Sequence, residues 1–199
     1  MQKQKNSIQI RKIEKNINPL FVNRWSPRAM SGEEISYDDL MGLFEAARWA
    51  PSSYNNQPWR FIFAKRNTDH WQTFISFLAE GNKIWAQNAA VLVVVISRKN
   101  FEFNEKPAIT HQFDAGAAWE NLALEATSRG LVTHGMQGFD YNQARKELDV
   151  PENFDVMAMI AIGKLGKKEN LPIDLKEREY PSDRKPLEEI VMEAKFIVR

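Results

Sequence analysis

The stretch Ala50-Pro51-Ser52-Ser53-Tyr54-Asn55-Asn56-Gln57-Pro58-Trp59 carries the strongest structural signal in this chain. Prolines near both ends stop a helix from continuing through it. Between the prolines lie six polar or amphipathic side chains, a high density for a loop between two buried elements. Such a loop can supply many fixed hydrogen bonds to a ligand. Taken alone, it is equally consistent with an elaborate turn from a helix to a strand, with Trp59 packed in the core.

Helices and strands are expected on both sides of this loop. Ser36 and Asp39 form a Ser-x-x-Asp variant of the capping box, which opens a helix that extends to about Trp49. The β-branched run at 91–96 is typical of a strand covered on both faces. The other expected elements are helices over about 68–80, 110–129 and 141–148 and strands at 60–64 and 156–162. Because strands and helices interleave without strict βαβ spacing, the order predicts α+β layers around one small sheet.

Glycines and small residues refine these expectations. Gly81 is expected to end the helix at 68–80, residues 135–138 to form a turn, and the tail from Gly163 to be irregular until structure resumes at 186–190. Along 110–129, apolar and mostly small residues recur on one face with helical spacing, at Ala115, Ala118, Trp119, Leu122, Ala123 and Ala126. Such a stripe predicts a close contact between helices, and it is able to bring two long helices together in a dimer interface.

Composition excludes several classes of protein. A chain of 199 residues is expected to form one domain over 1–199. Lys and Arg number 27 against 26 acidic residues, so no global charge favours a nucleic acid or a membrane surface as partner. The absence of cysteine excludes disulfides, thiolate nucleophiles and cysteine-ligated metals, and it fits a cytoplasmic location. The longest apolar run, 89–96, is shorter than the roughly 18 residues of a membrane-spanning helix.

Common catalytic motifs are missing from the sequence. It contains no Gly-x-Gly-x-x-Gly, Walker A, Gly-x-Ser-x-Gly or His-Glu-x-x-His pattern. The three histidines, His70, His111 and His134, are scattered, so each is expected to be structural, and neither a metal site nor a catalytic side chain is predicted. An enzyme with so little side-chain chemistry takes its reactivity from a cofactor.

A second polar segment, Arg24-Trp25-Ser26-Pro27-Arg28, places two guanidinium groups four residues apart around a hydroxyl. Guanidinium groups suit bidentate binding of phosphate and can stabilise an anion on a reduced ring. By themselves, two arginines favour a solvated basic loop.

Together these segments resemble those of the FMN-dependent nitroreductases. Residues 24–28 are similar to the Arg-Arg-Ser-x-Arg opening of that family, and residues 45–59 resemble its signature loop. Glu120-Asn121-Leu122, Gly135-Met136-Gln137-Gly138-Phe139, Ala161-Ile162-Gly163 and 184–191 keep the order of the family, so the resemblance covers about 20–191. It implies an α+β, three-layer fold in which helices flank a small mixed, mainly antiparallel sheet, in an intertwined homodimer.

The resemblance also implies a binding site for FMN at the subunit interface. Arg24, Ser26 and Arg28 would hold the phosphate and the pyrimidine edge, and Arg184 would add a second phosphate contact. Trp25 departs from the family by replacing a basic residue, and it would either pack structurally or stack near the cofactor. The loop residues that would contact the flavin of the partner subunit are Pro51, Ser52, Ser53, Asn55 and Gln57. The residues that would lie along the ring are Met136, Gln137 and Gly138, which offer a backbone N–H, and Asn82.

The implied activity is an oxidoreduction. NAD(P)H would pass hydride to FMN, and a small nitroaromatic or quinone-like acceptor would collect the electrons by a ping-pong mechanism. The same fold and cofactor also allow dehalogenation, azoline oxidation or flavin fragmentation, and a non-catalytic flavin-binding dimer is an alternative of another class. No ribose-binding motif distinguishes NADH from NADPH.

Overall fold

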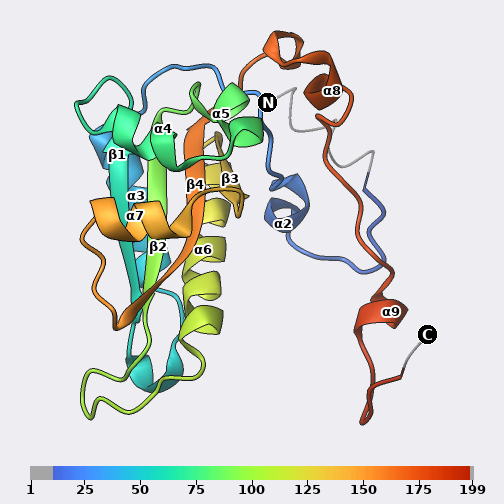
Figure 1. The fold of residues 1–199 in the computed structure, drawn as a ribbon. Helices are drawn as coiled ribbons and strands as arrows, with labels where there is room; N and C mark the ends of the chain where they lie inside the picture. Colours follow the sequence, from blue (N-terminus) through green and yellow to red (C-terminus); the bar gives the residue numbers. More distant parts are fainter. Residues whose placement is uncertain (1–10, 198–199) are drawn as a thin grey trace.

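The structure, a computed structural model, describes residues 11–197 and is built around one four-stranded sheet (Figure 1). The strands are β1 (Trp59–Lys65), β2 (Val91–Arg98), β3 (Leu131–Met136) and β4 (Phe154–Lys164). Their order is β1-β2-β4-β3, and all three pairings are antiparallel. The prediction of a mainly antiparallel sheet flanked by helices is therefore confirmed. β1 and β3 form its two opposite edges.

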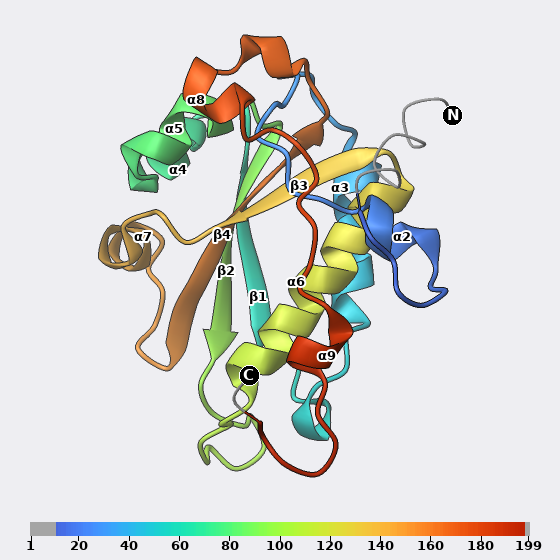
Figure 2. The ribbon, with the colours of Figure 1, turned by 90° about the vertical axis from the view of Figure 1, so that its right-hand side faces the viewer.

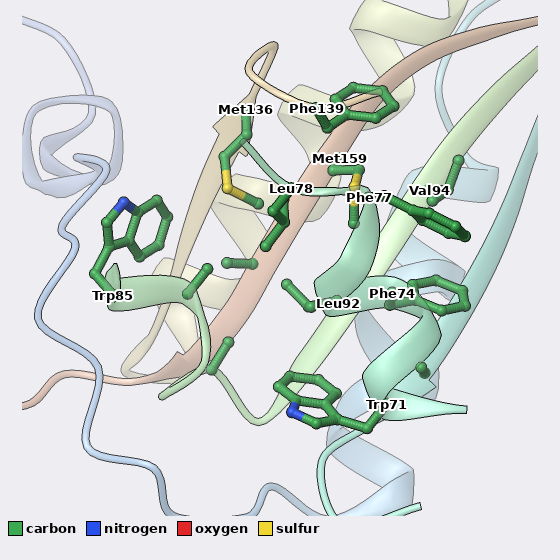
Figure 3. Packing of buried hydrophobic residues seen from close by; sticks show 14 of the residues in the cluster. Trp71, Phe74, Phe77, Leu78, Trp85, Leu92, Val94, Met136, Phe139 and Met159 are labelled. Carbon is green, nitrogen blue, oxygen red and sulfur yellow. The ribbon is translucent and has the colours of Figure 1, made fainter. Parts of the chain in front are cut away.

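Helices cover both faces of this sheet, as the β-branched run at 91–96 predicted. One face packs against α3 (Tyr37–Arg48) and α6 (His111–Ser128). The other face packs against α4 (Trp71–Phe77), α5 (Glu80–Ala86) and α7 (Tyr141–Glu147), where Figure 3 shows the aromatic packing. Alternate residues of β2 point into the two clusters, Val91 and Val93 into one, Leu92 and Val94 into the other. This alternation makes β2 the shared wall of both cores.

The remaining elements are short and lie outside these layers. They are α2 (Pro19–Asn23), the 3-10 turns at Ser53–Asn55 and Lys168–Asn170, α8 (Ile173–Lys176) and α9 (Leu187–Ile190). Figures 1 and 2 show that α2 and the segment carrying α9 lie on the same side of the domain as α6, and α2 is in contact with α6. Within residues 11–197, no helix is long and apolar enough to cross a bilayer.

Local capping signals at two helices agree with the sequence. The hydroxyl of Ser36 accepts a hydrogen bond of 2.9 Å from the N–H of Asp39, so it caps α3 as expected. Gly130 follows α6 with a φ of +73°, the left-handed conformation in which a helix commonly ends.

Three expectations about helix and strand ends were wrong. Gly81 does not end a helix but lies in the first turn of α5. The preceding helix, α4, ends before it, because the backbone becomes extended at Leu78, which pairs with Phe139 in an isolated bridge. Residues 135 and 136 do not form a turn, since both pair with β4 and extend β3. The chain after Gly163 is not irregular from the start, because β4 runs to Lys164 and α8 follows, whereas α9 agrees with the expected return of structure at 186–190. In each case tertiary pairing overrides the local signal.

The small-residue stripe of α6 makes the close contact that its spacing predicted, but within the chain. Ala115, Ala118, Leu122 and Ala126 are all buried, in one cluster with Leu40 and Leu43 of α3 and with the sheet. These buried residues are therefore unavailable for a dimer interface, and the expectation that they contact a second copy was wrong, whereas Trp119 of the same stripe is only partly buried. Amphipathic spacing identifies a buried face but does not tell which partner covers it.

Replacing Leu122 tests this packing. Leu122 is fully buried between α3 and the sheet, so we expect Leu122→Ala to lower the free energy of unfolding by about 2–5 kcal/mol. Urea denaturation monitored by circular dichroism measures the loss. Leu165→Ala is the matched control, because Leu165 is 45% exposed just beyond β4. Equal losses in the two variants would show that α6 does not pack as described.

Candidate functional site

Arginines from distant parts of the chain line one cavity. Its volume is about 360 Å³, and its lining includes Arg24, Trp25, Ser26, Arg28 and Arg184, all predicted as site residues from the sequence. The structure thus brings the segment at 24–28 together with a residue far along the chain. The lining residues that sequence reasoning missed are Arg11, His134, Arg178, Tyr180 and Ser182. A cavity with five arginines is suited to an anion.

The buried carboxylate of Glu179 fixes one wall of this cavity. Its Oε1 accepts hydrogen bonds of 2.7 Å from the N–H of Arg28 and 2.8 Å from the N–H of Ala29. Its Oε2 lies 3.9 Å from Nη1 of Arg28. One side chain therefore holds both the backbone and the charge of Arg28 in place. Local sequence patterns do not predict this role, since Glu179 lies in a strongly charged tail.

Other arginines of the cavity are held more loosely. Nε of Arg24 lies 3.7 Å from Oε1 of Glu120, and Nη1 of Arg24 lies 3.4 Å from the hydroxyl of Ser26. Nη1 of Arg184 donates to the hydroxyl of Ser182 at 3.2 Å and to nearby backbone carbonyls. These side chains therefore keep donors that can turn toward a ligand.

His134 lies on β3 where that strand borders the cavity. Its Nδ1 is 3.1 Å from the carbonyl oxygen of Pro27, which can only accept, so Nδ1 carries the proton. Burial lowers the pKa of His134, an effect that the positive charge of Arg28 reinforces, and the imidazole is neutral at neutral pH. The ring of Trp85 packs against it, with centroids 4.7 Å apart. These contacts give His134 a structural role in the wall.

A second histidine forms an arrangement with the residue types of a hydrolase triad. His111 lies with Nδ1 3.1 Å from the hydroxyl of Ser97 and Nε2 3.7 Å from Oδ2 of Asp155. However, Ser97 is fully buried, and its hydroxyl donates to the carbonyl of His111 at 2.9 Å. The serine is thus inaccessible and its proton is engaged, so the group joins β2 to α6 and is no nucleophile.

The proline-bounded loop is tightly folded and strained. Tyr54, Asn55 and Gln57 all have left-handed φ values, between 48° and 53°, a conformation that costs roughly 1–2 kcal/mol per non-glycine residue. The hydroxyl of Ser52 accepts a 3.0 Å bond from the N–H of Gln57, and Asp114 accepts a 3.1 Å bond from the N–H of Ser53. Backbone strain of this kind is common at binding sites.

Different parts of the loop carry different roles. Trp59 is buried in the core and begins β1, as expected for a turn that leads from a helix to a strand. The side chains of Ser53 and Asn55 make no hydrogen bond within residues 11–197, and Asn55 is exposed together with Pro51. Their polar groups are therefore available to a ligand or a second chain.

The loop and the arginine cavity lie at opposite edges of the sheet. The loop leads into β1, whereas the cavity borders β3 through His134. One chain therefore does not bring the two predicted halves of the site together. The prediction that they meet across two subunits is consistent with this separation, and it stays a prediction.

The residues predicted to lie along the flavin ring, Asn82 and 136–138, are found just beyond the cavity along β3. Nδ2 of Asn82 donates a 2.9 Å hydrogen bond to the carbonyl of Gly138, and a Cβ on Gly138 would come within 2.9 Å of that same nitrogen. Met136 is buried and points into the aromatic core (Figure 3), so its side chain is unavailable to a ligand. Gln137 and Gly138 follow the last paired residue of β3, which leaves their backbone N–H groups outside the sheet ladder.

Removing the anchor carboxylate tests how the cavity is held. We expect Glu179→Ala to lower the free energy of unfolding by about 2 kcal/mol or more, because two N–H groups lose their acceptor. Thermal and urea unfolding measure the change. Glu177→Ala removes the same charge from an exposed position two residues away and should leave stability nearly unchanged. If the two variants unfold alike, Glu179 does not anchor the segment.

Comparison with known proteins places this geometry in a family. The model of the nitroreductase family matches residues 22–83 and 67–164. A solved structure described as an oxidoreductase containing FMN is 45% identical, with a TM-score of 0.92, and 95% of this chain and 97% of that one are covered. An FMN-dependent nitroreductase from Clostridium difficile R20291 is 25% identical with a TM-score of 0.62, covering 72% and 84% of the two chains. An NADH dehydrogenase of Thermus thermophilus is 27% identical over 202 residues, covering 86% and 92%. The chain belongs to the nitroreductase family.

Proposed function

We propose that this protein is an FMN-dependent oxidoreductase that takes reducing equivalents from NAD(P)H and passes them to a small organic acceptor. The observation that carries the proposal is the arginine cavity built by residues 24–28 and Arg184. Family membership supports it, as do the FMN and NADH named for similar proteins.

The cavity fits the phosphate of FMN in charge. Arg28 is anchored by Glu179, so its guanidinium is held in place before a ligand binds. Within residues 11–197, Arg184 has no carboxylate oxygen within 4.0 Å, and Nε of Arg11 is buried with no hydrogen-bond partner. Uncompensated guanidinium groups of this kind fit a dianionic phosphate monoester.

The flavin ring would extend from the cavity toward Asn82 and Gly138. His134 borders the cavity and lies on the strand that ends at Met136, so this direction follows β3. The free N–H groups at Gln137 and Gly138 would donate to the ring, and Asn82 would hold the carbonyl of Gly138 in place. Contacts from Met136 would be limited to its backbone.

Bound FMN supplies hydride-transfer chemistry, so the chain itself needs no acid or base. The arginines would stabilise negative charge at the pyrimidine edge, and the backbone donors would orient the ring. NAD(P)H and the acceptor would use one binding surface in turn, which gives ping-pong kinetics. A nitroaromatic or quinone is the class of acceptor that we propose.

A homodimer would complete the site. Large apolar side chains are exposed where the loop meets the start of α6, at Trp49 (73%), Tyr54 (82%), Ile109 (90%) and Phe113 (80%). Exposed apolar surface of this size is typical of an interface. The segment around α9 also stands off from the domain with Ile190 and Val191 exposed (Figure 1). A second copy would cover these surfaces and bring Ser53 and Asn55 to the flavin of the partner.

Cofactor content and turnover test the proposal directly. The purified protein should be yellow, bind about one FMN per chain, and oxidise NADH or NADPH in the presence of a quinone. Arg28→Ala should weaken FMN binding about ten- to a hundredfold, because it removes one charge-assisted contact. Lys164→Ala, at an exposed ion pair with Glu33, is the control and should bind FMN normally. A colourless protein that does not bind added FMN would refute the cofactor assignment, and binding without turnover would leave a flavin-binding protein.

Complementation tests the shared site. Co-expressed Arg28→Ala and Ser53→Ala/Asn55→Ala chains should form mixed dimers with one intact and one doubly damaged site. Random pairing makes about half of the dimers mixed, so activity should recover to about one quarter of the wild-type level. Two affinity tags allow purification of the mixed dimer, and each variant alone provides the baseline. No recovery in verified mixed dimers would mean that each chain holds its own complete site.

A further inference from the structure

Hydrogen bonds between the two ends of the described chain bring Arg11 into the arginine cavity. The N–H of Lys12 donates to Oδ1 of Asp183 at 3.2 Å, and the N–H of Leu187 donates to Oε1 of Glu14 at 3.0 Å. Residues 11–14 therefore lie against residues 183–187. As a result, Arg11 lines the same cavity as Arg184, although it lies before the part of the chain that the nitroreductase resemblance covers.

Arg11 also holds the backbone of the binding segment. Its Nη1 donates to the carbonyl of Val22 and, at 2.7 Å, to the carbonyl of Arg24. Its Nε is buried without a hydrogen-bond partner in the part of the chain that the structure describes. The guanidinium is thus fixed in direction by main-chain contacts, while part of its donor capacity is unused.

Within the described residues, three arginines of the cavity have a carboxylate nearby, whereas Arg11 and Arg184 do not. Arg24 has Glu120 at 3.7 Å, Arg28 has Glu179 at 3.9 Å, and Arg178 has Asp174 at 3.7 Å. Across residues 11–197, neither Arg11 nor Arg184 has a carboxylate oxygen within 4.0 Å. Arg11 and Arg184 therefore lack a direct ion pair where the two chain ends meet, and Asp183 at this junction accepts hydrogen bonds from the N–H groups of Lys12 and Arg184 instead.

This arrangement is electrostatically unfavourable without an anion. Burial lowers the pKa of Arg11, and the charges of Arg184 and Arg24 lower it further, against an opposing effect of Asp183. Burial and these two positive charges disfavour the charged form of Arg11, whereas Asp183 favours it, and an arginine side chain stays protonated in proteins. A dianion placed between Arg11 and Arg184 would relieve the repulsion, and it would find donors already oriented.

We infer that Arg11 binds the phosphate of the ligand in this cavity, so that the segment at 11–14 gives the site its preference for FMN over unphosphorylated riboflavin. The inference rests on the proposed function for the identity of the ligand. Arg11 would thus supply the positive charge that is missing at Trp25, which replaces a basic residue of the family pattern.

The test compares two flavins that differ only in the phosphate. Dissociation constants of FMN and riboflavin are measured by flavin fluorescence on refolded or flavin-stripped protein. We expect Arg11→Gln to weaken FMN binding about ten- to a hundredfold and to leave riboflavin binding unchanged, because only FMN carries the phosphate. Arg11→Lys should restore part of the FMN affinity, since it keeps the charge but not the fork of donors. Lys12→Gln, which removes a charge from the next residue outside the cavity, is the matched control.

Each outcome decides the inference. Equal weakening of FMN and riboflavin would overturn it, because Arg11 would then act only by holding the carbonyls of Val22 and Arg24. Unchanged affinity for both flavins would overturn it as well.

A second measurement separates this inference from the proposed function. If wild-type protein binds neither flavin, the proposed function fails, and thermal unfolding is then measured with inorganic phosphate against chloride at equal ionic strength. Stabilisation by phosphate in the wild type that is lost in Arg11→Gln would uphold the role of Arg11. Equal stabilisation in both proteins, or none in the wild type, would reject it.

Discussion

The contact between the carboxylate of Glu179 and the backbone N–H groups of Arg28 and Ala29 is the constraint on which the site depends. It joins the segment that carries Arg24 and Arg28 to the C-terminal part of the chain that carries Arg184. A buried carboxylate needs hydrogen bonds or a nearby positive charge to be stable, and here two N–H groups donate to Oε1, while Oε2, which has no hydrogen-bond partner within residues 11–197, lies 3.9 Å from the guanidinium of Arg28. The same contact therefore satisfies a buried charge and positions a binding residue.

Around this anchor, the cavity collects more positive charge than its carboxylates neutralise. Among the residues that the structure describes, three of its five arginines have a carboxylate within 4.0 Å, whereas Arg11 and Arg184 do not. Main-chain carbonyls fix the direction of Arg11 instead. Donors that are oriented before binding need little reorganisation when an anion arrives. The positive charge is thus local, in a protein whose overall charge is nearly balanced.

The layered fold explains why one chain holds only part of the predicted site. The sheet separates the loop before β1 from the cavity beside β3, because these strands are its two edges. Tyr54, Asn55 and Gln57 of the loop keep left-handed backbone angles, the side chains of Ser53 and Asn55 make no hydrogen bond within residues 11–197, and apolar side chains are exposed beside them. A second copy is the partner that would use both features, since it would bring a loop to each cavity.

The sequence by itself determined the elements with strong local signals and the residues with distinctive chemistry. The β-branched run of β2, the cap at Ser36 and the glycine after α6 act over a few residues, so they could be predicted. The segment at 24–28 and Arg184 were identified through the resemblance, and the structure places them in one cavity. Tertiary structure alone decided the end of α4 at Phe77, the burial of the α6 stripe against α3, and the roles of Glu179 and Arg11. These depend on contacts between residues far apart in the chain, and local propensity and periodicity carry no information about such partners.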